Sequence, residues 1–331
     1  MNRQVIIDIL AAGRVANLPS VVSNVVLGAV VFGVFGQISW PAVAGGCGCG
    51  MFLYLGGCFL NDWWDRNWDK ENKPDRAVPS GRLSGGLLLG LAIFCFVIGM
   101  GLSLVLGPIA VSFALLIVVL ILVYSFIHKR TSFGVIPMGL CRALLYFLGF
   151  FSANPEFYLW EISDGAFVYY VDFTDWVSLL FCPAIGLLSY IAGLSLLARH
   201  EARGDQPSAS RVVAYFLLFL PILTHAVWTG SQVPLLAVLS ALPFLIVVFL
   251  ATRRIKTSIG AGVSSLLAAI PLLDFVLVFP LAWGAFFEAH RISQYLGRGD
   301  GINEWSLFLP AFISLLAFFL ARVLQKIAPA T

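Results

Sequence analysis

Residues 85–127, GGLLLGLAIFCFVIGMGLSLVLGPIAVSFALLIVVLILVYSFI, decide the fold, because they contain no charged residue. A transmembrane helix needs about 20 predominantly apolar residues, so this stretch is long enough for two, over 85–106 and 108–127. Irregular chain and open sheet edges cannot lie in lipid, because their backbone polar groups find no partners there. The stretch therefore predicts a pair of membrane-spanning helices.

The composition of the whole chain agrees with a membrane protein. Of its 331 residues, 60% are hydrophobic and 11% are charged, whereas soluble domains average roughly 45–50% apolar and about 25% charged. Such a chain cannot cover itself with polar side chains in water, so we expect a lipid bilayer around it. The net charge of +3 gives no indication of a nucleic-acid partner. No short apolar core with a small-residue cleavage site follows the first charged residues, so we expect no removable signal peptide.

Polar residues divide the rest of the chain into further lengths of the same kind. The candidate spans are 17–37, 41–61, 85–106, 108–127, 133–153, 177–198, 211–229, 233–251, 261–284 and 304–325. Only residues 230–232 separate the seventh and eighth spans, which predicts a tight helical hairpin. Pro271 and Pro280 are expected to kink the ninth. The predicted fold class is all-α, a single multi-pass transmembrane bundle over 1–331 with about nine to ten helices.

Positive charge predicts the orientation, because loops rich in Lys and Arg remain cytoplasmic. With ten spans and a cytoplasmic N-terminus, nearly all basic residues fall on the cytoplasmic side, and the acidic fifth loop falls on the other. Nine spans would leave Arg322 and Lys326 outside, so ten is preferred. We expect an inner- or plasma-membrane protein with both termini cytoplasmic and charged cytoplasmic loops at about 62–84 and 199–210.

The first charged loop begins with residues 61–69, NDWWDRNWD. If the second span continues into it as helix, Asp62, Asp65 and Asp69 have the spacing i, i+3 and i+7 and share one face. Like charges so placed repel each other unless divalent cations lie between them, and oxygen-only ligands suit Mg²⁺ bound to a substrate phosphate. The alternative is a solvated loop in which acids and bases simply pair.

Basic residues follow these carboxylates, at Lys73, Arg76 and Arg82. Guanidinium groups bind phosphate oxygens bidentately, so the arrangement favours a phosphate ligand. The second charged loop, on the same predicted side, contains Glu201 and Asp205 at i and i+4. Two carboxylate clusters on one side of the membrane are what a shared metal–phosphate site requires.

These motifs resemble those of the UbiA superfamily of intramembrane prenyltransferases. Residues 61–69 have the form of its NDxxDxxxD signature. Residues 73–82, KPDRAVPSGR, resemble its N-K-P-x-R-P-x-x-x-G run, with two residues inserted between its arginine and its second proline. Residues 14–17, RVAN, are similar to its R-P-x-N, and residues 124–129, YSFIHK, to the tyrosine-to-lysine segment that ends its fourth helix.

The second motif departs from the usual DxxDxxxD, because the aligned positions are Ala198, Glu201 and Asp205. One acid is missing and another is longer by a methylene, although Glu201 and Asp205 can still hold one Mg²⁺ between them. The altered motif keeps a second hypothesis open, a non-catalytic relative that binds or transports an isoprenoid or related metabolite. A third, a phospholipid-forming CDP-alcohol transferase, requires a D-G-x-x-A-R run that the sequence lacks.

The resemblance implies a helical bundle whose central polar cavity opens to the cytoplasmic side. It implies an enzyme that transfers a prenyl group from a prenyl diphosphate to a small aromatic or lipophilic acceptor in the membrane, with Mg²⁺ as cofactor. The implied catalytic and metal-binding residues are Asp62, Asp65, Asp69, Glu201 and Asp205. The implied substrate-binding residues are Arg14, Asn17, Asn61, Lys73, Arg76, Arg82, Tyr124, Lys129 and Arg142.

An allylic cation formed in such a site needs a dry pocket with aromatic walls. The candidates are Trp63, Trp64, Trp68, Tyr124 and Tyr146, although Trp and Tyr also anchor helices at the membrane interface.

Two charged residues are predicted inside the membrane, Arg142 in the fifth span and Asp274 in the ninth. Charged groups at that depth are costly and are by default functional or paired. We expect them either to pair with each other or to line a polar cavity. Asn24, in the first span, is interpreted as a helix-packing residue.

Overall fold

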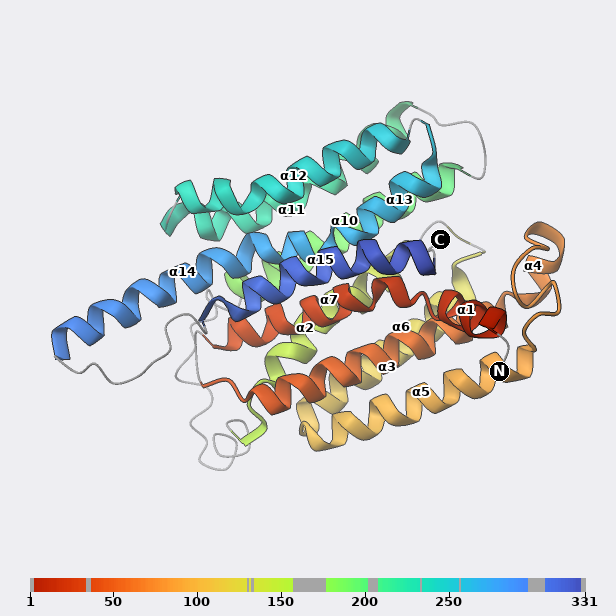
Figure 1. Cartoon of the computed structure of the whole chain (residues 1–331), viewed down its shortest axis with the longest axis horizontal. Helices are drawn as coiled ribbons and strands as arrows, with labels where there is room; N and C mark the ends of the chain where they lie inside the picture. The colour runs from red at the N-terminus through yellow and green to blue at the C-terminus, as the bar shows by residue number, and fades with distance from the viewer. Residues whose placement is uncertain are drawn as a thin grey trace.

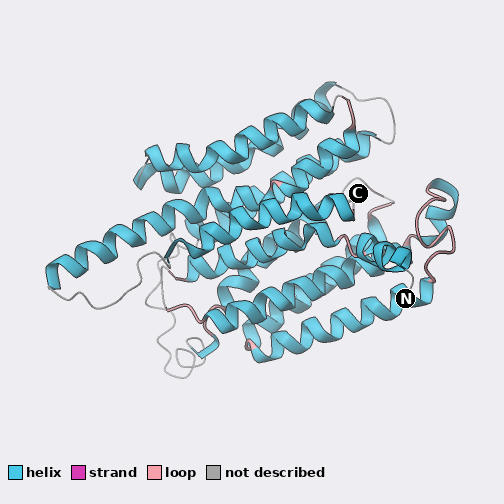
Figure 2. Cartoon of the chain, viewed as in Figure 1, coloured by secondary structure: helices cyan, strands magenta, loops and turns pink. Residues whose placement is uncertain are grey.

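The computed structural model is a bundle of helices that lie alongside one another (Figure 1). No strand occurs among the described residues (Figure 2). Those residues are 3–33, 37–129, 131, 134–156, 177–201, 208–232, 234–255, 257–296 and 307–328. The short helix α1 (Arg3–Ala12) and the end of the last helix lie at the same end of the bundle (Figure 1). An even number of crossings, as predicted for ten spans, places both ends of a chain on one side.

Five long helices form the N-terminal part of the bundle. They are α2 (Leu18–Phe32), α3 (Trp40–Trp64), α5 (Gly85–Val105), α6 (Pro108–Ile127) and α7 (Val135–Ser152). The short elements η1 (Val15–Asn17) and α4 (Arg66–Asn72) adjoin α2 and α3. The C-terminal part consists of η4 (Val177–Phe181), α10 (Cys182–Glu201), α11 (Ser208–Gln232), α12 (Pro234–Ile255), α13 (Ile259–Ala268), α14 (Ile270–Leu296) and α15 (Leu309–Ile327).

Nine stretches of the described chain are long and apolar enough to cross a membrane, so the chain is an integral membrane protein with an all-α, multi-pass fold. These nine stretches coincide with nine of the ten predicted spans. In the predicted seventh span the corresponding apolar length is Val212–Thr224, within α11. The tenth crossing therefore remains a prediction.

The helix α5 shows how a lipid-facing helix is built. Its exposed side chains are as apolar as its buried ones; Leu104, for example, is 70% exposed. Its buried residues recur every three or four positions, at Leu88, Ala92, Cys95, Gly99 and Ser103. Only one stripe of this helix therefore packs against the bundle, and the rest of its surface suits lipid.

The ninth predicted span is divided into α13 and α14, with a turn at Ala269. Pro271 has no backbone N–H, and its ring would clash with the carbonyl of the residue four positions earlier. The helix consequently ends and restarts just before Pro271. The kink predicted at this proline is therefore a break between two helices. Pro280 lies inside α14.

The helix α2 is central, because it packs against α3, α7, α14 and α15. Two glycines allow it to approach α7 closely. A Cβ atom at Gly28 would overlap the backbone carbonyl of Tyr146, and one at Gly149 would overlap that of Val25. Small residues at such contacts let helices in lipid associate through van der Waals packing and hydrogen bonds. This packing sets the polar residues of α2 and α7 against each other inside the bundle.

Candidate functional site

The Asp-rich segment is almost continuously helical. The helix α3 ends at Trp64 and α4 begins at Arg66, but two backbone hydrogen bonds keep the helical spacing across Asp65. The Asp65 N–H donates to the Asn61 carbonyl at 2.9 Å, and the Asp69 N–H donates to the Asp65 carbonyl at 2.8 Å. The predicted helical continuation of the second span is therefore confirmed, with a turn at Asp65.

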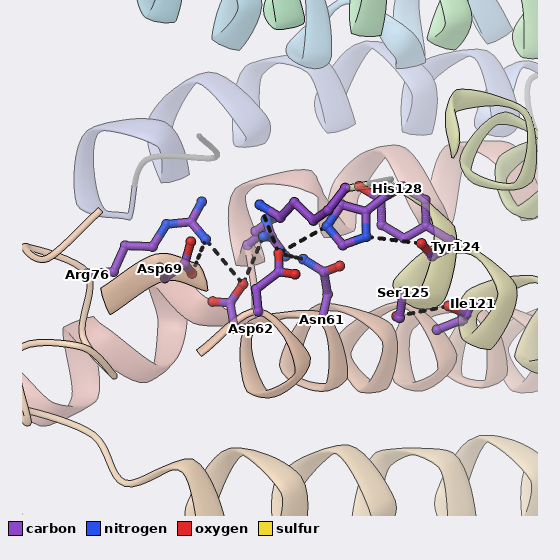
Figure 3. Close-up of polar contacts among 11 residues, drawn as sticks. Asn61, Asp62, Asp69, Arg76, Ile121, Tyr124, Ser125 and His128 are labelled. Carbon is purple, nitrogen blue, oxygen red and sulfur yellow. Dashed lines mark hydrogen bonds and ion pairs between the residues drawn. The ribbon is translucent and has the colours of Figure 1, made fainter. Parts of the chain in front are cut away.

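Two of the three carboxylates, Asp62 and Asp69, converge on Arg76 (Figure 3), and a second arginine approaches Asp62. Arg76 Nη1 lies 2.8 Å from Asp69 Oδ2 and 3.9 Å from Asp62 Oδ1. Arg14 Nη2 lies 3.0 Å from the same Asp62 oxygen. The cluster thus joins α3, α4, the turn before η1 and the segment that follows α4.

The third carboxylate, Asp65, binds a different set of basic groups. Its Oδ2 lies 3.0 Å from His128 Nε2 and 3.3 Å from Lys129 Nζ, at the end of α6. The Asn61 amide also donates to it at 3.4 Å. Burial would raise the pKa of Asp65, but the hydrogen bond and charge of His128, together with Lys129, outweigh burial and lower it. Asp65 is therefore held as a carboxylate.

His128 was not identified from the sequence as a site residue. Its Nδ1 lies 3.0 Å from the Tyr124 carbonyl, and this contact with the preceding helical turn orients the ring toward Asp65. The only signal in the sequence was its position next to the predicted Lys129.

Arg14 reaches Asp62 from an unusual backbone conformation. It has φ 46° and ψ 46°, and it is the one residue other than glycine with positive φ in the described chain. The left-handed conformation costs about 1–2 kcal/mol in a residue with a side chain. Burial would lower the pKa of Arg14, but the negative charge of Asp62 counters it, and the net shift is upward. The strained turn therefore holds a protonated guanidinium between α1 and α3.

Lys73 lies beside other cations. Partial burial and the positive charges of Arg76 and Lys129 lower its pKa. Such crowding is unfavourable, and the negative charge of Asp69 counters only part of it. An anion at this position would relieve the repulsion.

Arg82 is not directed at the Asp-rich residues. Its Nε donates to Asp8 Oδ2 of α1 at 3.0 Å, and its Nη2 donates to the Asp75 carbonyl at 2.9 Å. This ion pair ties α1 to the segment after α4. Arg82 also lines the polar chamber described below, and its phosphate contact remains a prediction.

Two cavities adjoin the cluster. A polar chamber of about 390 Å³ is lined by Arg14, Asp62, Asp69, Arg76 and Arg82, among others. An apolar cavity of about 200 Å³ is lined mainly by small and apolar residues of α3, α6 and α7, and its polar lining consists of Arg14, Tyr54, Asn61, Tyr124 and Arg142. Arg14 lines both cavities, so it stands at their boundary.

The aromatic wall differs from the prediction. Tyr124 lines the apolar cavity as predicted, and it is joined by Tyr54, which sequence analysis did not identify. The predicted Trp63, Trp64, Trp68 and Tyr146 are not among the described residues that line the cavity. Trp64 and Trp68 are 45% and 40% exposed, which suits interfacial anchoring.

Three buried oxygen atoms near the site have no hydrogen-bond partner among the described residues. They are Oδ1 of Asn17, Oδ1 of Asn61 and Oδ1 of Asp69. The amide nitrogen of Asn17 donates to Tyr54 Oη at 3.0 Å, which fixes its side chain. Buried acceptors normally find a partner, so these atoms are suited to a ligand, an ion or water.

The two intramembrane charges do not pair directly. Arg142 Nη1 donates to Ser20 Oγ at 2.9 Å and to Asn24 Oδ1 at 3.4 Å. The Asn24 amide nitrogen donates to both Asp274 oxygens, at 2.9 and 3.1 Å. Tyr146 Oη donates to Asp274 at 2.6 Å. Asn24 therefore bridges the two charges and joins α2, α7 and α14.

The second Asp-rich motif is only partly described. Glu201 is the last residue of α10, but its side chain and the whole of Asp205 lie outside the described residues. Within the described chain, no three His, Cys, Asp or Glu side chains lie close enough to hold a metal. The donor chemistry of the first motif nevertheless fits Mg²⁺, because it supplies carboxylates and the unpartnered oxygens of Asn61 and Asp69.

Comparison with known proteins gives one family. A model of the UbiA prenyltransferase family matches residues 21–279. Digeranylgeranylglyceryl phosphate synthase of Methanopyrus kandleri is 32% identical over 125 residues, which cover 37% of this chain and 44% of that protein. The Saccharolobus solfataricus enzyme of the same name is 38% identical over 106 residues, covering 31% of this chain and 38% of that protein. The matches thus span less than half the length of these curated relatives.

Solved structures show the same fold. One, from a study of digeranylgeranylglyceryl phosphate synthase in membranes, has a TM-score of 0.53 and 16% identity, over 84% of this chain and 97% of that one. The apo structure of a UbiA homolog from Aeropyrum pernix K1 has a TM-score of 0.51 and 12% identity, over 93% of this chain and 98% of that one.

Proposed function

The chain belongs to the UbiA prenyltransferase family, and we propose that it transfers a prenyl group from a prenyl diphosphate to a small acceptor within the membrane. The observation that carries this proposal is the position of Arg14, which lines both the polar chamber and the apolar cavity. A prenyl diphosphate has one highly charged end and one apolar end. It would place its diphosphate in the polar chamber and its tail in the apolar cavity.

The polar chamber supplies groups of both signs for the diphosphate. Asp62, Asp65 and Asp69 would hold Mg²⁺, which when bound neutralises charge on the leaving diphosphate. Arg14 and Arg76 already lie within 3.0 Å of these carboxylates, so they are placed to donate to phosphate oxygens held nearby. The diphosphate would also stabilise the charged form of Lys73, because its negative charge offsets the repulsion between Lys73 and Arg76.

The apolar cavity suits the isoprenoid end. Burying an apolar chain gains about 0.8 kcal/mol per CH₂ group. Gly50 and Gly57 of α3 line this cavity, and because they have no side chains they leave room in it for the chain. Tyr54 and Tyr124 line this cavity, where their rings would stabilise an allylic cation, and the apolar wall would exclude water from it.

A second candidate function is a non-catalytic carrier of an isoprenoid-type metabolite. Two observations favour it. Each of the three carboxylates is already paired with a basic side chain, and Ala198 stands where the second motif usually has an acid. A carrier would bind a prenyl diphosphate without breaking its C–O bond.

The test is Mg²⁺-dependent release of diphosphate by the purified protein from a panel of prenyl diphosphates, with aromatic and lipid-alcohol acceptors. Asp65→Asn and Glu201→Gln are compared with Glu71→Gln, a matched control that neutralises an exposed acid in α4 with no described ion pair. Release that needs Mg²⁺, disappears in both site variants and persists in the control supports the transferase. Saturable binding without release across the panel supports the carrier instead.

A further inference from the structure

Arg142 is a buried cation at the wall of the apolar cavity. It lies in the middle of α7, is 7% exposed and lines the cavity. Its guanidinium lies 4.8 Å from the centre of the Tyr54 ring. None of the ion pairs among the described residues includes it. A charge at such depth is expensive unless it is paired or has a ligand.

One edge of this guanidinium is free. Both of its hydrogen bonds, to Ser20 and Asn24, start from Nη1. Nε and Nη2 have no hydrogen-bond partner among the described residues. Neither nitrogen is fully enclosed by protein atoms. Because Arg142 lines the apolar cavity, these two nitrogens are accessible to a ligand there. Together they form the side-on fork that binds both oxygens of a carboxylate.

The other edge is fixed by a fully buried network. Asn24 and Asp274 are both 0% exposed, and Asn24 links Nη1 of Arg142 to the Asp274 carboxylate. Tyr146 holds Asp274 from α7 itself. The network orients the guanidinium and balances part of its charge without occupying its free edge. The fork is therefore preorganised for a ligand.

The position of the fork separates it from the diphosphate end. Tyr54, beside Arg142, precedes Asn61 by two helical turns of α3, which is about 10 Å along the axis. At this depth Arg142 is the one described cation that lines the cavity, apart from Arg14 at the boundary. A planar fork can bind either a carboxylate or a phosphate bidentately. A single cation balances the full charge of a carboxylate but only part of the charge of a phosphate dianion.

We propose that Arg142 recognises a carboxylate on the prenyl acceptor, and that it selects carboxylic acids over neutral acceptors of the same shape. The inference rests on the proposed prenyl transfer for the identity of the ligand as an acceptor. The carboxylate lies against Nε and Nη2 of Arg142, and the rest of the acceptor lies in the apolar cavity near the prenyl tail.

The test measures binding of 2-naphthoate and of its neutral carboxamide to the full-length protein in nanodiscs, by saturation-transfer NMR. The wild type is expected to bind the carboxylate about 10- to 100-fold more tightly than the carboxamide, as lost charge-assisted hydrogen bonds imply. Arg142→Gln is expected to remove this preference. Arg142→Lys is expected to keep only part of it, because an ammonium has no planar fork.

Two controls keep the result interpretable. Arg322→Gln changes another arginine of a membrane-spanning helix, which contacts Ser265 and Gln325 outside the cavity, and it should leave the preference unchanged. Thermal unfolding of each variant, compared with that of the wild type, shows whether it is folded. If Arg142→Gln fails that control, Arg142→Lys carries the test, and an unchanged preference in it overturns the proposal.

Other outcomes also overturn the proposal. These are equal binding of carboxylate and carboxamide by the wild type, and a preference that persists in Arg142→Gln. Tighter binding of 2-naphthyl phosphate that depends on Arg142 would assign the fork to a phosphate instead. A carboxylate preference without any prenyl transfer would leave Arg142 as a carboxylate site and refute only the proposed enzymatic function.

Discussion

Arg14 Nη2 and Asp62 Oδ1 form an ion pair of 3.0 Å at the boundary between the polar chamber and the apolar cavity. The pair joins the turn before η1 to the end of α3. It places a cation where the first phosphate of a prenyl diphosphate would meet its first apolar carbon. Loss of this cation should therefore affect ligand binding more than it affects the remainder of the bundle.

Arg14→Gln is expected to weaken binding of geranylgeranyl diphosphate about 10- to 100-fold, the range that lost charge-assisted hydrogen bonds imply. The measurement is an equilibrium titration in detergent with Mg²⁺. Arg66→Gln is the matched control, because Arg66 lies over the Trp63 ring and donates to the Trp63 carbonyl. Equal weakening in both variants would contradict a special role for Arg14.

Arg76→Gln should lower the stability of the metal-free protein by about 1–3 kcal/mol, because it leaves the buried Asp69 carboxylate without its partner. Mg²⁺ should raise the unfolding temperature of this variant by more than it raises that of the wild type, because the ion replaces the lost positive charge. Thermal unfolding with EDTA and with Mg²⁺ measures both effects. An equal response to Mg²⁺ in the two proteins would argue against metal binding at Asp69.

The stability of the metal-free protein should depend on Asp65 at acid pH. The folded pKa of Asp65 is lowered from an unfolded value of about 3.9. Its contribution is therefore complete above the unfolded pKa and is lost as the pH falls through the folded pKa. Below about pH 5, wild-type stability should fall more steeply than that of Asp65→Asn, measured by thermal unfolding in EDTA. Parallel curves would contradict this, and Glu71→Gln serves as the control.

Gly57→Ala should shorten the prenyl chain that the protein accepts. A Cβ atom at Gly57 would lie 3.1–3.3 Å from the side chain of Ile121, and both residues line the apolar cavity, so the added methyl group would narrow it. The preference among diphosphates with 10, 15 and 20 carbons should move toward the shorter ones. Gly90→Ala is the matched control, because a Cβ atom there meets nothing within 4 Å. A chain-length preference unchanged from the wild type would place the tail elsewhere.

The helices and the first carboxylate motif could be predicted from sequence because their signals are local. Apolar runs and proline positions fix most spans, and the spacing of Asp62, Asp65 and Asp69 follows from helical periodicity. The departures arise from contacts between distant segments. The ion pair between Arg82 and Asp8 of α1 is one such contact, and no local pattern connects residues so far apart in sequence.

The same reason explains the site residues that sequence analysis missed. His128 acquires its role because the end of α6 packs against the Asp-rich segment, at Asp65. Tyr54 joins the site because α3 turns that face toward Arg142. Asn24 was interpreted as a packing residue, and it does join helices, but its bridge between Arg142 and Asp274 depends on the close approach of α2 and α7.

The central claim is that a single prenyl diphosphate spans both cavities. It is tested most directly by photolabelling the purified protein, with Mg²⁺, using a geranylgeranyl diphosphate analogue that carries a diazirine in its tail, followed by mass spectrometry of the peptides. The account predicts labelling of the cavity-lining parts of α3 and α7, around Tyr54 and Leu145, and its suppression by excess geranylgeranyl diphosphate. Competed labelling confined to the outer, lipid-facing surface of α5 or α12 would contradict it.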